Sequence, residues 1–119
     1  MLSLRFFQND NVSTLDIDEH CYERLAKSGL DSKVNYSNYS IEVEGEKYDD
    51  VFAVKLNFDN RYELLKIVES ERHNELMKMI TKFVNPTIKE IEEVYGYAIV
   101  LTEMYEMIKS EDNLYFSYV

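Results

Sequence analysis

The chain has 119 residues, a hydrophobic fraction of 45% and a formal net charge of −10. This length fits one domain, which we expect to span residues 1–119, and the hydrophobic fraction is too high for a disordered chain. The acidic excess disfavours direct contact with nucleic acid, because phosphate binding needs clustered Lys and Arg side chains.

The cysteine content and the apolar runs indicate the compartment. Cys21 is the single cysteine, which excludes an internal disulfide and fits a reducing environment. The first ten residues lack the apolar segment of a signal peptide, and no apolar run approaches the roughly 18 residues of a membrane-spanning helix. We therefore expect a cytoplasmic protein that makes no membrane contact.

The N-terminal part is predicted to form one strand and one short helix. Residues 1–7 alternate apolar and polar side chains in the manner of a strand, and the turn residues 9–11 end it. A short helix follows, with Asp16 or Asp18 as its N-cap, and ends at about Ser28.

Residues 39–44 and 51–58 predict a hairpin, because each alternates between apolar and polar positions. Gly45 supplies a turn residue, and the interval between the two strands predicts a loop longer than two residues. The inward side chains of the second strand are expected to be Phe52, Val54, Leu56 and Phe58.

A first long helix is predicted from Asp59 or Asn60 to about Val84. Its apolar stripe is interrupted by the polar segment 69–75, where we expect the helix to bend or to pass through solvent. The expected stripe consists of Leu64, Leu65, Val68, Leu76, Met79, Ile80 and Phe83.

A second long helix is predicted over 85–109. It begins either with Asn85 as N-cap before Pro86 or with Thr87 and Glu90 as a capping box. Its apolar residues recur at three- and four-residue steps, although residues 95–101 alone would also fit a buried strand. The expected stripe includes Ile88, Ile91, Tyr95, Ala98, Leu101 or Thr102, Tyr105 and Ile108.

Residues 114–119 alternate again and predict a final strand. Strands and helices that segregate in this order indicate an α+β fold. We expect a mostly antiparallel four-stranded sheet, with the two long helices packed on one face and one short helix.

Three clusters of reactive side chains have structural explanations. His20 and Cys21 are consecutive in a predicted helix and point about 100° apart, so a buried structural cysteine is favoured over a nucleophile. Asp16, Asp18 and His20 suggest metal ligands but also fit helix capping. Glu69 and His73 stand at positions i and i+4, where a carboxylate orients a base or forms an ordinary surface pair. We expect no catalytic residue, no cofactor and no metal.

The segment 42–50 has the strongest indication of a function, because it holds five acidic residues and one lysine. Carboxylates meet Arg and Lys of a partner, and tyrosines supply contact area at low entropic cost. The alternative is a solvated hairpin tip. The expected partner-binding residues are Tyr39, Glu42, Glu44, Glu46, Tyr48, Asp49 and Asp50.

Small size, acidity and the lack of a catalytic motif favour a binding protein that inhibits a basic partner. The interpretation is an immunity protein or antitoxin that neutralises a toxin nuclease by masking its basic active-site surface, by analogy of function class. The alternatives are a phage-encoded inhibitor of a host nucleic-acid enzyme, an enzyme without a readable motif that uses His73 and Glu69, and a structural homo-oligomer subunit. The sequence leaves the oligomeric state open.

Overall fold

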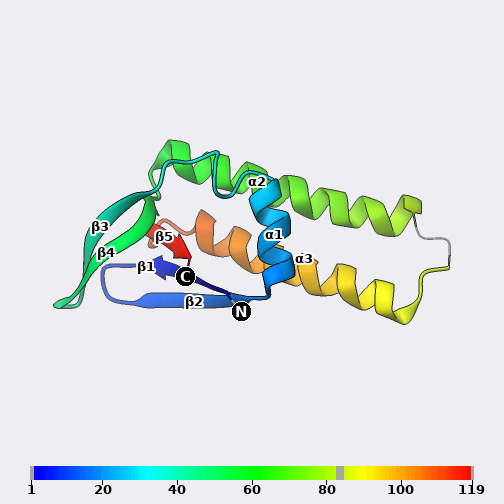
Figure 1. Ribbon diagram of the computed structural model, residues 1–119, viewed down its shortest axis with the longest axis horizontal. Coiled ribbons are helices and arrows are strands. Elements are labelled where there is room, and N and C mark those ends of the chain that lie inside the picture. The colour runs from blue at the N-terminus through cyan, green and yellow to red at the C-terminus, as the bar shows by residue number, and fades with distance from the viewer. Residues whose placement is uncertain (1, 83–84, 119) are drawn as a thin grey trace.

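The computed structural model describes residues 2–82 and 85–118, which form five strands and three α-helices (Figure 1). The strands form one antiparallel sheet in the order β2-β1-β5-β4-β3. The elements are β1 (Leu2–Phe7), β2 (Val12–Ile17), α1 (Glu19–Lys27), β3 (Ser37–Val43), β4 (Glu46–Lys55), α2 (Phe58–Met77), the π-helical segment η1 (Lys78–Lys82), α3 (Ile88–Lys109) and β5 (Tyr115–Tyr118).

The predicted α+β class is confirmed, but the predicted four strands are wrong, because β2 is a fifth strand at the edge of the sheet. The turn at 9–11 reverses the chain, so that Leu15 pairs with Leu4 and Ile17 with Leu2. This edge strand escapes the sequence pattern because its polar residues leave only a short apolar alternation. Asp18 caps α1, as one of the two expected options.

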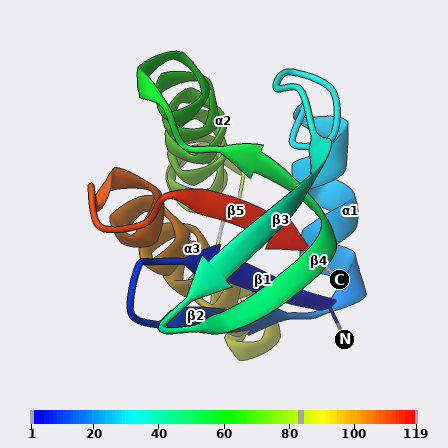
Figure 2. The same ribbon diagram turned by 90° about the vertical axis from the view of Figure 1, so that its left-hand side faces the viewer.

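The sheet carries a main core on the face that packs against the helices. Phe6, Val54 and Phe116 come from the strands, and Leu64 and Leu101 from α2 and α3. A smaller cluster lies on the other face, where Figure 2 shows the β3–β4 hairpin crossing over β1 and β5. That cluster consists of Phe7, Ile41, Val43, Val51 and Ala53, with partly buried tyrosines around it.

The hairpin's crossing changes which side chains of β4 are buried. Val54 and Leu56 face the main core as predicted, but Val51 and Ala53 are buried too, in the cluster on the opposite face. The inward placement of Phe52 and Phe58 is wrong. Phe52 stacks on Tyr36 with half of its surface exposed, and Phe58 is already the exposed first residue of α2.

The two long helices begin at specific capping residues. The side chain of Asn57 accepts from the backbone of Asn60, so α2 begins slightly earlier than predicted, and its predicted end at Val84 lies outside the described residues. Thr87 and Glu90 form the reciprocal capping box of α3, which decides between the two expected starts. Residues 95–101 are helical, so the strand alternative is wrong.

The buried side of α3 differs from the predicted stripe. Leu101 and Ile108 of the predicted stripe are buried as expected, but Ile88, Ile91 and Tyr95 were expected inside and are exposed. The helix carries two apolar stripes on different sides, and only one of them can face α2 and the sheet. The buried stripe consists of Val94, Tyr97, Leu101, Met104 and Ile108. Likewise Leu76 and Ile80, expected inside, are exposed.

A polar cluster joins the three helices, and we call it the α1 clasp (Arg24, Ser28, Glu71, Glu75 and Tyr97). Arg24 donates to Glu75, whose side chain is only 2% exposed, and its guanidinium lies 4.0 Å from the ring centroid of Tyr97. Ser28 and Tyr97 both donate to Glu71. Burial raises the pKa of the Tyr97 hydroxyl further above its ordinary value.

Arg61 ties the beginning of α2 to the end of α3. Its guanidinium donates to the backbone carbonyls of Leu56, Ile108, Ser110 and Asn113. Burial lowers the pKa of Arg61, although an arginine remains charged. These bonds fix the chain where it passes from α3 into β5.

Within residues 2–82 and 85–118, no helix is both long enough and apolar enough to cross a membrane.

We expect Arg24→Met to lower the free energy of unfolding by about 2 kcal/mol, because it removes one of the two cations that pair with the buried Glu75 carboxylate and leaves only Lys78 to balance it. The matched control is Lys66→Met, whose partner Glu63 is 39% exposed and whose loss should cost less than about 1 kcal/mol. Urea unfolding measures both values. Equal costs for the two variants would contradict the role given to the α1 clasp.

Candidate functional site

The tip of the β3–β4 hairpin is a two-residue turn. Glu44 and Gly45 both have positive φ angles, 50° and 82°, which is the pattern of a type I′ turn. The prediction of a longer loop is therefore wrong, and the segment from Glu46 onward belongs to β4. The sequence did not indicate this turn, because Glu44 occupies a position where Asn, Asp or Gly is usual.

A β-bulge interrupts the same hairpin. Tyr39 pairs with Val51 and Ile41 with Tyr48, so Asp49 and Asp50 together lie opposite one residue, Ser40. Asp50 has a φ of 53°, and the Ser40 hydroxyl donates to the Asp49 carboxylate at 3.2 Å. The bulge thus holds two neighbouring carboxylates in a fixed place on the strand, and both side chains are exposed.

The hairpin separates the expected tyrosines from most of the expected carboxylates. Tyr48 pairs with Ile41 and packs edge-on against Phe7 at 5.6 Å between ring centroids. Tyr39 packs against Tyr115 at 5.0 Å. Both rings are half-buried on the face that carries the smaller apolar cluster. Glu42 is exposed and stands opposite Lys47 in the register of the two strands. The Lys47 amine lies 3.7 Å from a carboxylate oxygen of Asp49, so one lysine accompanies the carboxylates.

The hairpin tip is attached to the neighbouring hairpin. The backbone N–H of Glu44 donates to the carbonyl of Asn9 in the β1–β2 turn at 3.2 Å. Figure 1 shows both turns at the same end of the molecule, opposite the end at which α3 begins. Asp10 thereby joins this surface. We call it the acidic end, and it consists of Asp10, Glu42, Glu44, Glu46, Asp49 and Asp50.

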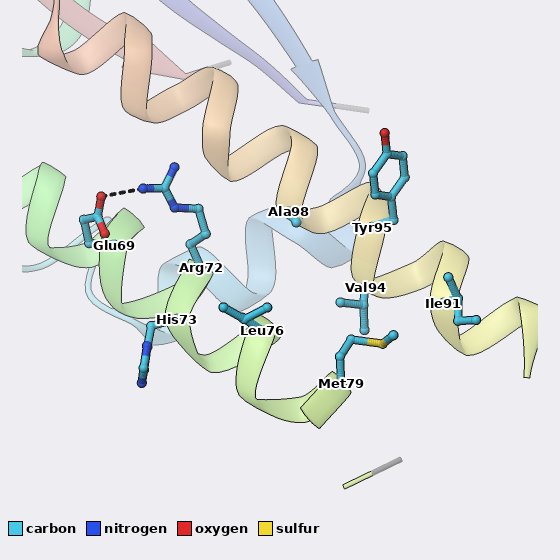
Figure 3. A pocket seen from close by; sticks show the side chains of 9 residues that line it. All are labelled: Glu69, Arg72, His73, Leu76, Met79, Ile91, Val94, Tyr95 and Ala98. Carbon is cyan, nitrogen blue, oxygen red and sulfur yellow. Dashed lines mark hydrogen bonds and ion pairs between the residues drawn. The ribbon is translucent and has the colours of Figure 1, made fainter. Parts of the chain in front are cut away.

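A second surface lies at the opposite end, between α2, η1 and α3. It is a groove of about 590 Å³, which we call the distal groove (Figure 3). Figure 3 shows Met79 of η1 lying toward Val94 of α3, with Leu76 on the α2 wall. The groove is lined by Glu69, Arg72, His73, Leu76, Met79, Ile91, Val94, Tyr95 and Ala98.

The expected pair of Glu69 and His73 is not brought together. Glu69 accepts a hydrogen bond from Arg72 at 2.6 Å, and Figure 3 shows His73 pointing away from Glu69. The Glu69 carboxylate is therefore bound to Arg72 and does not orient the His73 imidazole. Its guanidinium also lies 4.9 Å from the ring centroid of Tyr105 on α3, so it bridges the two helices.

The candidates near the start of α1 have structural partners. Asp16 accepts from the hydroxyl of Ser3 at 2.6 Å, and Asp18 accepts from the backbone N–H of Cys21. That backbone bond holds the pKa of the Asp18 carboxyl below its ordinary value. His20 is exposed. Within the described ranges, no three side chains of the metal-ligating kinds come together as a site.

Cys21 is a buried thiol. Its side chain belongs to the main core, and burial raises its pKa to about 11, with the Asp18 carboxylate acting in the same direction. A thiol with this pKa stays protonated at neutral pH, whereas nucleophilic cysteines have lowered values. The interpretation as a structural cysteine is consistent with this position.

Comparison of the chain with protein family models, with curated proteins and with solved structures gives no match. The two surfaces therefore have to be interpreted from their own chemistry. The acidic end was anticipated from the charge of 42–50, but the contribution of Asp10 depends on a contact between two hairpins. The distal groove was missed, because its apolar residues were assigned to the core and Glu69 and His73 were considered only as a pair. The available signal was that α3 holds more apolar residues than one face can accommodate.

We expect Cys21 to react with a thiol reagent at pH 8 about a hundredfold more slowly in the native protein than in urea, because its pKa is raised from 9.0 to about 11. The raised pKa also means that this group favours the fold below pH 9 and loses that contribution as the pH rises toward 11. As a control, the cysteine is moved to the exposed position 32 by Cys21→Ser with Ser32→Cys. Fast reaction of native Cys21 would contradict its burial.

Proposed function

We propose that this protein binds a basic partner protein through the acidic end and inhibits it. In this proposal the chain is an immunity protein or antitoxin that acts in the cytoplasm and covers the basic active-site surface of a toxin nuclease. The observation that supports the proposal is the backbone hydrogen bond from Glu44 to Asn9, which attaches the acidic hairpin to its neighbour. A phage-encoded inhibitor of a host nucleic-acid enzyme would use the same chemistry.

The arrangement favours binding because the carboxylates are held in place before the partner arrives. The type I′ turn, the bulge at Asp49 and Asp50 and the bond from Glu44 each restrict the hairpin. A surface ordered in advance loses less conformational entropy when it binds. In this proposal Tyr39 and Tyr48 contribute mainly by stiffening the hairpin from behind, through their contacts with Tyr115 and Phe7.

The charge distribution favours fast encounter with a basic partner. The net charge of −10 produces a negative field, and the six carboxylates of the acidic end are exposed. Such a field steers an oppositely charged partner and raises the association rate by about tenfold or more at low salt. A nuclease carries the required basic surface, because it must contact phosphates.

The proposal is tested by affinity capture from an extract of the source cell, with washes at low and then high salt. The expected result is a stoichiometric basic protein that is weakened or released by salt, because exposed charge pairs are screened. Its nuclease activity should fall in the presence of the chain. Capture of only acidic proteins, or of none while the bait is folded, would contradict the proposal.

Neutralising the acidic end should slow association with that partner. We expect Glu42→Gln, Glu44→Gln and Glu46→Gln together to lower the association rate by about tenfold at low salt and to leave dissociation less affected. The matched control removes the same charge from exposed positions on α1 and α3, by Glu23→Gln, Glu103→Gln and Glu106→Gln. Surface plasmon resonance measures both rates. An equal effect of the two triple variants would indicate general charge rather than this surface.

A further inference from the structure

α3 exposes an apolar stripe on the side opposite its buried one. Ile88 and Tyr95 are 75% and 67% exposed, and Ile91 and Ile99 are 42% and 40% exposed. Their spacing of three or four residues places them along one side of the helix. We call these four residues the outer stripe.

The α2 side and η1 extend this surface across the distal groove. Leu76 is 58% exposed and lines the groove of about 590 Å³ that also reaches Ile91 and Tyr95 of the outer stripe (Figure 3). Ile80 of η1 follows Leu76 by four residues and is 66% exposed. The face therefore consists of a ridge, formed by the outer stripe, and an adjoining hollow. Exposed apolar patches of this extent mark contact sites in proteins.

The remaining elements do not cover this face. α1 lies on the other side of the two long helices, where the α1 clasp contacts Glu71 and Glu75 of α2 and Tyr97 of α3. Figure 1 shows α2 and α3 continuing beyond the sheet and past α1. Within the described part of the chain, the outer stripe is thus left to solvent on a protein that has ample charge for solubility elsewhere.

We propose that a second copy of this chain covers the face and that the protein is a two-fold symmetric dimer. Pairing the two helical hairpins makes a four-helix arrangement, in which the ridge of each copy enters the groove of the other. A two-fold interface needs one self-complementary surface, and a ridge beside a groove on the same face meets that need.

The exposed apolar side chains of this face offer an area of the order that a stable dimer needs. A standard interface buries roughly 800 Å² on each partner. An aromatic side chain alone buries about 150–250 Å² when it is fully covered, so Tyr95, together with the other exposed apolar side chains of this face, supplies an area of that order.

The lack of free charge on this face also fits a second copy. The outer stripe itself carries no charge, so it does not suit the basic partner of the acidic end. Beside the groove, Arg72 is paired with Glu69 of its own helix, so a second copy that covers the groove meets a neutralised pair there. A two-fold axis along the hairpin places α2 of one copy against α3 of the other.

Sedimentation equilibrium tests the proposal with the full chain. We expect the wild-type protein to have twice its chain mass of 14.2 kDa at high concentration. Tyr95→Glu should raise the dimer dissociation constant at least about a hundredfold, because it places an unpaired charge at the centre of an apolar interface. Ile88→Glu should act in the same direction, and circular dichroism verifies that both variants remain helical.

The control is Phe52→Glu, an aromatic residue replaced by Glu at a position that is 50% exposed and belongs to β4 of the sheet instead of the helical hairpin. It should leave the dissociation constant unchanged. A wild-type chain that stays monomeric up to its solubility limit would overturn the proposal and leave the stripe to a different protein. A dimer that resists both Tyr95→Glu and Ile88→Glu would also overturn it, because the interface would then lie elsewhere.

Discussion

The α2–α3 hairpin is longer than the sheet against which it packs, and this constraint shapes the rest of the structure. The molecule measures 54 × 25 × 21 Å, and its long direction follows the two helices (Figure 1). Short strands can cover only the part of the hairpin near the beginning of α2 and the end of α3. The other part needs different partners, because two helices alone cannot bury their apolar sides.

The part of the α2–α3 hairpin beyond the sheet has different contacts on its two sides. On one side α1 supplies Arg24, which pairs with the buried Glu75, and this polar contact replaces the apolar packing that the sheet provides elsewhere. On the other side the outer stripe and the distal groove are left open, which is the basis for the proposed dimer. The acidic end lies far from both, so that association of two copies and binding of a basic partner can coexist.

Local signals in the sequence were sufficient for much of the fold and less so for the surfaces. Capping residues and alternation predicted α1, α3 and the β3–β4 pair, because these depend on neighbours in sequence. The edge strand β2 and the two-residue turn at Glu44 were not predicted. The strand depends on its pairing with β1, and the turn depends on its contact with Asn9. The buried side of α3 was predicted at Leu101 and Ile108 but not in the first half of the helix, because two apolar stripes there fit a core and tertiary packing selects one.

The most direct test of this account is amide hydrogen exchange at low and high protein concentration. If a second copy covers the part of the hairpin beyond the sheet, residues 88–99 of α3 should exchange more slowly at high concentration, because association opposes local opening. The β3–β4 hairpin should exchange at the same rate in both samples. Exchange in residues 88–99 that does not depend on concentration would contradict the account.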